Sequence, residues 1–278
     1  SDINTVVQDI NREVTTEITH VFPNVEAGKD LAEILLHVTE KTGEKFIMII
    51  DEWDAVFREA RENTKLQKEY VTFLRSLFKS SWTDIVFEAA YLTGILPIKK
   101  YGTQSAMTDF REYSMLAPKK LAEYVGFTEP EVKDLCNQYH MDFEKMKKWY
   151  DGYSFNKVKS VYNPNSVMEA IKSEEFGNYW TQTETYTSLQ FYIDMNEDGL
   201  KESITQMLGG ARIKIDTGTF QNDMTTIKSQ DDVLTLLVHL GYLAYDANDK
   251  VVFIPNEEIR SEFTDAVEEN QWNEFLEL

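Results

Sequence analysis

Apolar residues recur at helical spacing near the start of the chain and then give way to continuous apolar runs. The helical spacing predicts helices over residues 2–22 and 29–42. Residues 46–50 are apolar at every position, which is typical of a strand buried on both faces of a parallel sheet. A helix predicted over 66–80 separates this strand from a second apolar run at 84–92. The order strand, helix, strand predicts a parallel crossover within an α/β core.

Beyond residue 95, short helical segments replace the apolar strands. Helices are predicted over 119–125, 131–139 and 143–149, and together they resemble a helical lid. The heptapeptides WYDGYSF and VYNPNSV then predict a helix end at Gly152, a small hairpin, and a helix capped by Asn163. We assign no chemistry to these two heptapeptides.

The last part of the chain predicts a helix, a hairpin and a further helix. The helix over 231–240 is broken by Gly241, and strands over 242–245 and 251–254 can pair across an Asp-Ala-Asn-Asp turn. A helix is expected from Asn256, and this order is that of a winged-helix unit. We therefore expect three regions, which are an α/β core over 1–117, a helical lid with a small hairpin over 118–200, and a winged-helix-like region over 201–278.

Composition narrows the class of protein. The 278 residues include 28 basic and 48 acidic side chains, a formal net charge of -20, which argues against broad binding to nucleic acid or to an anionic membrane. The single cysteine, Cys136, excludes an intramolecular disulfide and a multi-cysteine metal site, and we expect it to be a small buried apolar side chain. No apolar run reaches the roughly 20 residues of a membrane-spanning helix, and no signal peptide opens the chain. We therefore expect a globular, cytoplasmic protein with no membrane partner.

Three carboxylates follow the first predicted strand, in the sequence FIMIIDEWD. Ligands of open α/β sheets bind at the carboxyl ends of the strands, where Asp51, Glu52 and Asp54 would emerge. The pattern is typical of a Walker B element, in which Asp51 would hold Mg²⁺ and Glu52 would polarise the water that attacks ATP. The alternative interpretation is a buried strand followed by a solvated acidic turn.

Thr93 follows the second predicted strand, in the sequence YLTG. If the two strands are neighbours, Thr93 lies beside the carboxylates, where the sensor-1 side chain of an ATPase hydrogen-bonds the attacking water or the γ-phosphate. The alternative is structural, because threonine is a good strand residue and Thr-Gly is a common strand exit.

A phosphate-binding loop of the form G-x-x-x-x-G-K-[ST] is absent from the sequence. The Gly28-Lys29 pair is followed by Asp30, and Pro23 stands where the first glycine of such a loop belongs. Without this loop, most of the electrostatic stabilisation of phosphoryl transfer is missing. We therefore expect either the middle of a longer protein or a fold that is kept without the activity.

Several segments together resemble a known family. They are IIDEWD at 49–54, YLTGILPIKKYGTQSAMTDFREYSML at 91–116, WYDGYSF at 149–155, VYNPNSV at 161–167, YWTQT at 179–183 and GYLAYDANDKVVFIPNEEIRSEF at 241–263. In the same order, over about residues 1–270, the chain resembles the bacterial AAA-ATPase-like family. Members of that family typically join a P-loop ATPase domain to a C-terminal nuclease domain of the PD-(D/E)XK type.

The resemblance implies a partial P-loop NTPase core of the AAA-like or STAND-like kind, with Mg²⁺ and ATP as ligands. It places Asp51 on the Mg-binding acid of the family and Glu52 on its catalytic acid, and Trp53 where tyrosine is common. Asp54 matches a further acid of the family pattern, which we group with the cofactor-binding residues. The sequence contains neither the Walker A loop nor the nuclease domain, so we attribute no nuclease activity to it.

Three hypotheses for function follow. The first is an ATPase domain whose hydrolysis regulates an attached effector and which is inactive in this truncated form. The second is a non-catalytic module that binds protein or nucleic acid and keeps a vestigial nucleotide site. The third, which we regard as the weakest, is a metal-dependent hydrolase in which Asp51, Glu52 and Asp54 bind the metal directly.

The net charge and the acidic residues after 256 predict no appreciable binding to duplex DNA. A local group of lysines interleaved with aromatic residues near WYDGYSF is the strongest contrary feature. Its members are Lys145, Lys147, Lys148, Lys157 and Lys159. We interpret them as a solvated helix face, because exposed lysine on a helix is the common case.

Overall fold

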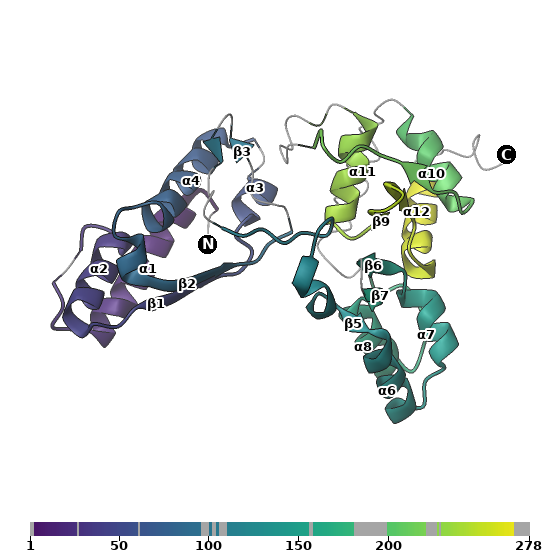
Figure 1. Cartoon of the computed structure of the whole chain (residues 1–278), viewed down its shortest axis with the longest axis horizontal. Coiled ribbons are helices and arrows are strands. Elements are labelled where there is room, and N and C mark those ends of the chain that lie inside the picture. Colours follow the sequence, from purple (N-terminus) through teal and green to yellow (C-terminus); the bar gives the residue numbers. More distant parts are fainter. Residues whose placement is uncertain are drawn as a thin grey trace. The chain divides into compact units, whose positions relative to one another are not determined.

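The structure is a computed structural model of the chain. It describes residues 3–26, 28–60, 62–95, 100–101, 104–105, 110–155, 158–180, 199–220, 227 and 229–269. Contacts within the chain divide it into two compact units, Ser1–Arg111 and Glu112–Leu278 (Figure 1). Among the helices in the described ranges, none is long and apolar enough to cross a membrane. The division into three regions with limits at 117 and 200 stays a prediction.

The first unit consists of a pair of strands and the helices that pack on it. Its elements are η1 (Ile3–Thr5), α1 (Val6–Val21), α2 (Leu31–Thr42), β1 (Phe46–Ile50), α3 (Ala55–Glu59), α4 (Thr64–Phe78), α5 (Thr83–Val86), β2 (Phe87–Leu92), β3 (Lys100–Tyr101) and β4 (Gln104–Ser105). The Asp30 side chain caps α2 by accepting a hydrogen bond from the Glu33 N–H at 3.0 Å, and Gly43 ends the helix in the left-handed conformation. The predicted helices are confirmed here, although the segment predicted as a strand over 84–92 begins with the short helix α5.

Strands β1 and β2 pair in parallel, so the predicted α/β crossover is confirmed. Met48 lies opposite Ala90, and Ile50 lies opposite Leu92. These side chains pack against a core built from α1, α2 and α4, which lie on one side of the strand pair in Figure 1. The parallel pairing brings the carboxyl ends of the two strands to the same edge of the sheet.

The other face of this strand pair is exposed, and the prediction that both faces are buried is wrong. Ile47, Ile49 and Tyr91 expose 67%, 70% and 56% of their surface. The helices described in the first unit cover one face of the pair, so alternate residues of each strand face away from the core.

The second unit contains two small antiparallel sheets and their helices. Its elements are η2 (Lys119–Tyr124), β5 (Phe127–Thr128), α6 (Glu129–Tyr139), α7 (Phe143–Tyr150), β6 (Tyr153–Phe155), β7 (Val158–Tyr162), α8 (Pro164–Ser173), α10 (Leu200–Leu208), β8 (Ile213–Lys214), α11 (Gln230–His239), β9 (Ala244–Asp246), β10 (Val251–Phe253) and α12 (Glu257–Glu269). The strand orders are β5-β7-β6 and β8-β10-β9.

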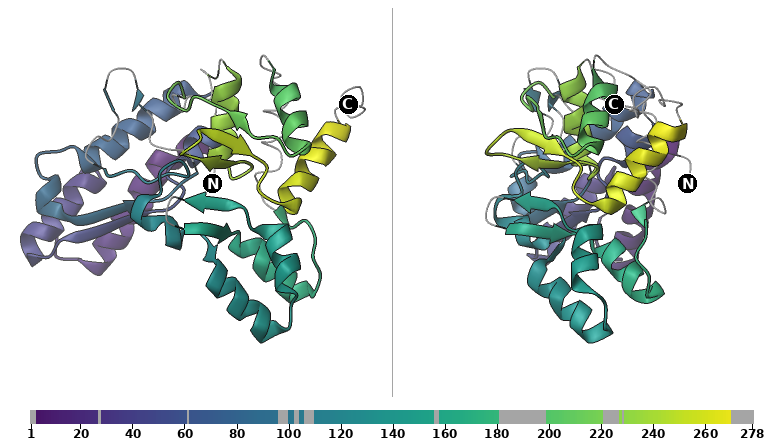
Figure 2. Two further views of the ribbon diagram at one scale, coloured as in Figure 1. Left: turned by 45° about the vertical axis from the view of Figure 1, so that its right-hand side comes forward. Right: turned by 90° about the vertical axis from the view of Figure 1, so that its right-hand side faces the viewer.

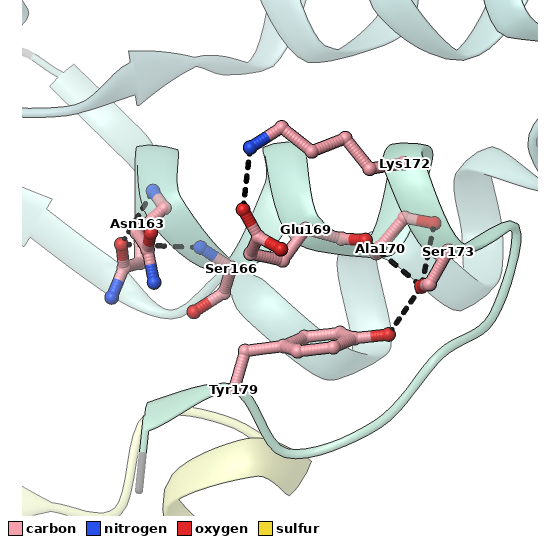
Figure 3. Close-up of polar contacts among 8 residues, drawn as sticks. Asn163, Ser166, Glu169, Ala170, Lys172, Ser173 and Tyr179 are labelled. Carbon is pink, nitrogen blue, oxygen red and sulfur yellow. Dashed lines mark hydrogen bonds and ion pairs between the residues drawn. The ribbon is translucent and has the colours of Figure 1, made fainter. Parts of the chain in front are cut away.

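In the first part of this unit, α6, α7 and α8 group together beside the β5-β7-β6 sheet (Figure 2). Capping residues explain where α6 and α8 begin. The Glu131 carboxylate accepts a hydrogen bond from the Thr128 N–H at 2.8 Å at the start of α6. The Asn163 side chain accepts a hydrogen bond from the Asn165 N–H at 2.9 Å at the start of α8 (Figure 3). The predicted hairpin and the predicted Asn163 cap are confirmed, whereas the segment 119–125 forms a 3₁₀ helix.

The predicted order of helix, hairpin and helix is also confirmed in the last part of the chain. Strands β9 and β10 pair in antiparallel fashion between α11 and α12. Every residue of α11 from Asp232 to His239 is buried, so this part of the helix has no exposed face that could enter a DNA groove. The winged-helix assignment itself stays a prediction. Cys136 is buried in α6, as expected.

Two buried carboxylates of α12 anchor the segment that follows α8. The Tyr179 N–H donates to Glu258 Oε1 at 2.9 Å, and the Asn178 side-chain amide donates to the Glu262 carboxylate. Burial raises the pKa of Glu258 to about 7 and also raises the pKa of Glu262. The hydroxyl oxygens of Ser173 and Tyr179 are 2.5 Å apart and attach the same segment to the end of α8 (Figure 3).

Candidate functional site

Asp51 and Thr93 meet where the two parallel strands of the first unit end. The Thr93 N–H donates to the Ile50 carbonyl at 2.9 Å, and the Trp53 N–H donates to the Thr93 carbonyl at 2.9 Å. The Thr93 hydroxyl also donates to Asp51 Oδ1. The strands are neighbours, as the sequence predicted, and their exits are joined by both backbone and side-chain hydrogen bonds.

Glu52 lies at the same edge with a left-handed backbone, at φ 50°. Its N–H donates to Asp51 Oδ1 at 3.0 Å, and its carbonyl accepts from the Ala55 N–H at 2.9 Å. The side chain is 61% exposed. Non-glycine residues adopt this conformation at a cost in free energy, and such residues cluster at functional sites. We call Asp51, Glu52 and Thr93 the carboxylate edge.

Asp54 lies apart from the exposed side chains of the carboxylate edge, although the sequence grouped it with Asp51 as a cofactor-binding residue. Its side chain is fully buried. The Asp54 Oδ2 oxygen lies 3.4 Å from Arg58 Nε and accepts a hydrogen bond from the Ile95 N–H at 3.2 Å. Asp54 thus connects the end of β1 to the chain that leaves β2.

Arg58 joins this buried carboxylate to the carboxylate edge. Its Nη2 atom lies 3.0 Å from Glu52 Oε2, on the same guanidinium whose Nε faces Asp54. The Arg58 side chain is only 16% exposed, so one nearly buried cation contacts two carboxylates. Sequence analysis did not single out Arg58. The available signal was its position four residues after Asp54, a spacing that places two side chains together on a helix.

Close packing supports the turn that carries these residues. Trp53 is buried and its ring lies 5.5 Å from that of Phe57, measured between centroids. A Cβ atom at Gly94 would stand 2.6 Å from both Trp53 Cδ1 and Asp54 Oδ1, so only glycine allows this approach. Burial and the nearby Asp54 charge raise the pKa of Tyr70 to about 12. The sequence suggested a strand exit at Thr93-Gly94 but not the steric reason for its glycine.

The donor atoms of the carboxylate edge suit a hard divalent cation. Mg²⁺ prefers oxygen ligands and is commonly bound by one or two carboxylates, waters and substrate phosphates. The oxygens of Asp51 and Thr93 fit that preference, although no group of three or more histidine, cysteine or acidic side chains able to hold a metal occurs in the described ranges. The arrangement does not support direct metal binding by Asp51, Glu52 and Asp54 together, because the Asp54 carboxylate faces Arg58.

Two of the lysines near WYDGYSF have acidic partners. Lys147 Nζ lies 3.0 Å from a Glu129 oxygen, and Lys148 Nζ lies 3.8 Å from a Glu257 oxygen. Lys157 lies outside the described residues. These ion pairs reduce the positive charge that this group could present to a nucleic acid.

Residues 1–103 match the sequence profile of the AAA-ATPase-like family, which is described as a predicted AAA-ATPase. The matched range includes the whole carboxylate edge, together with Asp54 and Arg58. Neither a curated protein nor a solved structure matches the chain. The first part of the chain is therefore similar to an ATPase domain of this family.

Proposed function

We propose that the first unit is the Mg-ATP-dependent part of a regulatory ATPase. The observation that carries the proposal is the contact between Asp51 and Thr93 at the carboxyl ends of two neighbouring parallel strands. Ligands of open α/β sheets bind at this kind of edge. The similarity of residues 1–103 to predicted AAA-ATPases supports the same conclusion.

Each residue of the carboxylate edge has a distinct role in this proposal. Asp51, oriented by the Thr93 hydroxyl, holds Mg²⁺ through water. Glu52, which is exposed beside it, polarises the attacking water. While its hydroxyl donates to Asp51, Thr93 accepts a hydrogen bond from that water, and it contacts the γ-phosphate only when this donor turns away from Asp51. When bound, the metal ion would neutralise charge on the phosphates.

The proposal also includes a limit on activity. The sequence contains no G-x-x-x-x-G-K-[ST] loop, so the groups that cradle the phosphates must come from outside these 278 residues. In this proposal the chain alone binds nucleotide weakly and does not hydrolyse it. Hydrolysis in the complete site would regulate an attached effector, for which the family resemblance suggests a nuclease domain.

Paramagnetic relaxation by Mn²⁺ tests the metal-binding edge on the chain itself. Mn²⁺ replaces Mg²⁺ at oxygen sites and broadens nearby nuclei even when binding is weak. We expect selective broadening of the backbone amides of Asp51, Glu52 and Thr93, and its loss in Asp51→Asn. Asp249→Asn, which removes an exposed acid of the second unit, is the matched control and should leave the broadening unchanged. Equal broadening in wild type and Asp51→Asn would refute the proposed metal site.

A further inference from the structure

We propose that Arg58, anchored by the buried Asp54, positions the Glu52 carboxylate. This inference rests on the proposed function, because it assigns a role to two residues around the proposed water-polarising acid. It starts from two contacts of one guanidinium, 3.4 Å from Nε to Asp54 Oδ2 and 3.0 Å from Nη2 to Glu52 Oε2. Arg58 is therefore a positioning residue that acts through Glu52.

Burial makes the Asp54 contact obligatory. A carboxylate removed from water is strongly destabilising unless it is paired and hydrogen-bonded. Asp54 is fully buried, and Arg58 and the Ile95 N–H are its observed partners. Moving the guanidinium away would separate a buried carboxylate from a cation that contacts it. The anchored end of Arg58 therefore has little freedom to move.

The shape of the guanidinium transmits this restraint to Glu52. Its donors lie in one rigid plane, so fixing Nε also fixes the direction in which Nη2 points. The Glu52 backbone is held independently by the Asp51 side chain and the Ala55 N–H. An exposed glutamate would otherwise sample many rotamers, and Arg58 restricts it to those that reach Nη2.

Asp54 also links the position of Glu52 to that of Thr93. Asp54 accepts a hydrogen bond from Ile95, which lies two residues after Thr93 in the strand exit. One buried carboxylate thus restrains both the residue proposed to polarise water and the backbone that carries Thr93. A lysine at position 58 would keep the charge, but its single ammonium group lacks the planar fork that meets both carboxylates.

The test uses the 278-residue chain with Mn²⁺ as the probe. Carboxyl carbons of Asp51 and Glu52 are labelled with ¹³C, and their Mn²⁺-induced relaxation is compared in wild type, Arg58→Lys and Asp54→Asn. We expect the Glu52 rate to change more than twofold in both variants. In Arg58→Lys the Asp51 rate should stay the same, because that variant keeps Asp54 and its hydrogen bond to the strand exit that carries Thr93. Arg12→Lys changes an exposed arginine whose Nη2 lies 2.6 Å from Asp9 Oδ1; it is the matched control and should change neither rate.

An unchanged Glu52 rate in Arg58→Lys would overturn the inference. A different result, in which neither carboxylate of the wild-type chain responds to Mn²⁺, would refute the proposed function. The positioning is then tested without metal by the Arg58 Nε–Hε resonance, which Glu52→Gln and Asp54→Asn should each shift. Absence of a shift in Glu52→Gln would overturn the inference in that case too. Glu52→Gln is the second variant because position 52 is exposed and its side-chain change leaves the core intact.

Discussion

The left-handed backbone of Glu52 predicts an unusual order of stability among variants at this position. Glu52→Gly and Glu52→Ala both remove the contact with Arg58. They differ in the backbone, since glycine adopts φ 50° without steric cost and alanine does not. The two variants therefore separate backbone strain from the loss of the side chain.

Two opposing contributions determine the expected difference in the free energy of unfolding between Glu52→Gly and Glu52→Ala. A left-handed backbone costs an L-residue about 1–2 kcal/mol, and this cost is present in the alanine variant and absent in the glycine variant. Glycine loses about 0.5–1 kcal/mol more than alanine in conformational entropy on folding. The lost ion pair, which is about 0.2–1 kcal/mol for exposed pairs, cancels in the comparison. We expect Glu52→Gly to be more stable than Glu52→Ala by about 0.5–1 kcal/mol.

Urea unfolding of the two variants measures this difference. With a slope of about 2 kcal/mol per molar urea, the midpoints should differ by about 0.4 M, with the glycine variant unfolding later. Ala55→Gly, at the start of α3, is the control for a right-handed position and should instead lower the midpoint. An alanine variant as stable as the glycine variant would show that the turn relaxes or stores no strain. Backbone strain would then no longer distinguish Glu52 as a functional residue.

Four further outcomes are expected. Gly94→Ala should destabilise the chain by about 1–3 kcal/mol in urea, because its methyl group would meet Trp53 and Asp54, whereas Gly177→Ala, with open space around it, should be close to neutral. Calorimetric titration with Mg²⁺ and ATP should give no tight, saturable binding, since the sequence lacks a phosphate loop, and a submicromolar Kd would contradict the proposed limit on activity. Fluorescence anisotropy with labelled duplex DNA at physiological salt should show no appreciable binding at a net charge of -20, and submicromolar binding would favour the interaction-module hypothesis. Glu258→Gln should reduce the loss of stability that accompanies rising pH. Because the pKa of Glu258 is raised to about 7, the folded state binds the proton more tightly than the unfolded state does. The resulting stabilisation is complete below the ordinary pKa of 4.5 and is lost as the pH rises through 7. Urea unfolding at pH 5 and pH 8 measures it, and the same pH dependence in both proteins would remove Glu258 as its source.

The parts of the fold that depend on local chemistry could be predicted from the sequence. Asn163 was placed correctly as a helix cap because capping involves residues within one turn of each other. The adjacency of Asp51 and Thr93 was also predictable, since two apolar runs joined by a helix favour parallel neighbours. Both inferences require only a short segment of sequence or a common connection rule.

The exposed face of the β1-β2 pair could not be predicted in the same way. All side chains of the run FIMII are apolar, but the run does not indicate which elements cover each face of the strand. Ile47 and Met48 are both apolar, yet Ile47 is exposed and Met48 packs against the core. Burial of a strand is a property of the tertiary arrangement, so a continuous apolar run does not by itself establish it.

At the candidate site, too, the sequence did not predict which of the three carboxylates of DEWD is buried and which are exposed. In the sequence all three acids follow the end of a strand, and Asp54 was grouped with Asp51 as a cofactor-binding residue. In the structure Asp51 faces Thr93, Glu52 is exposed with a left-handed backbone, and Asp54 is buried.

The arginine four residues after Asp54 could have separated these roles. A buried acid requires a cationic partner, and a helix places the side chain at i+4 beside the one at i. Asp54 and Arg58 satisfy both conditions. Asp51 instead accepts a hydrogen bond from the Thr93 hydroxyl and lies near solvent. An acid that follows a strand and precedes an arginine by four residues is therefore a candidate anchor for the neighbouring site, and the exposed Glu52, which contacts the same arginine through Nη2, is the acid that stays beside the ligand.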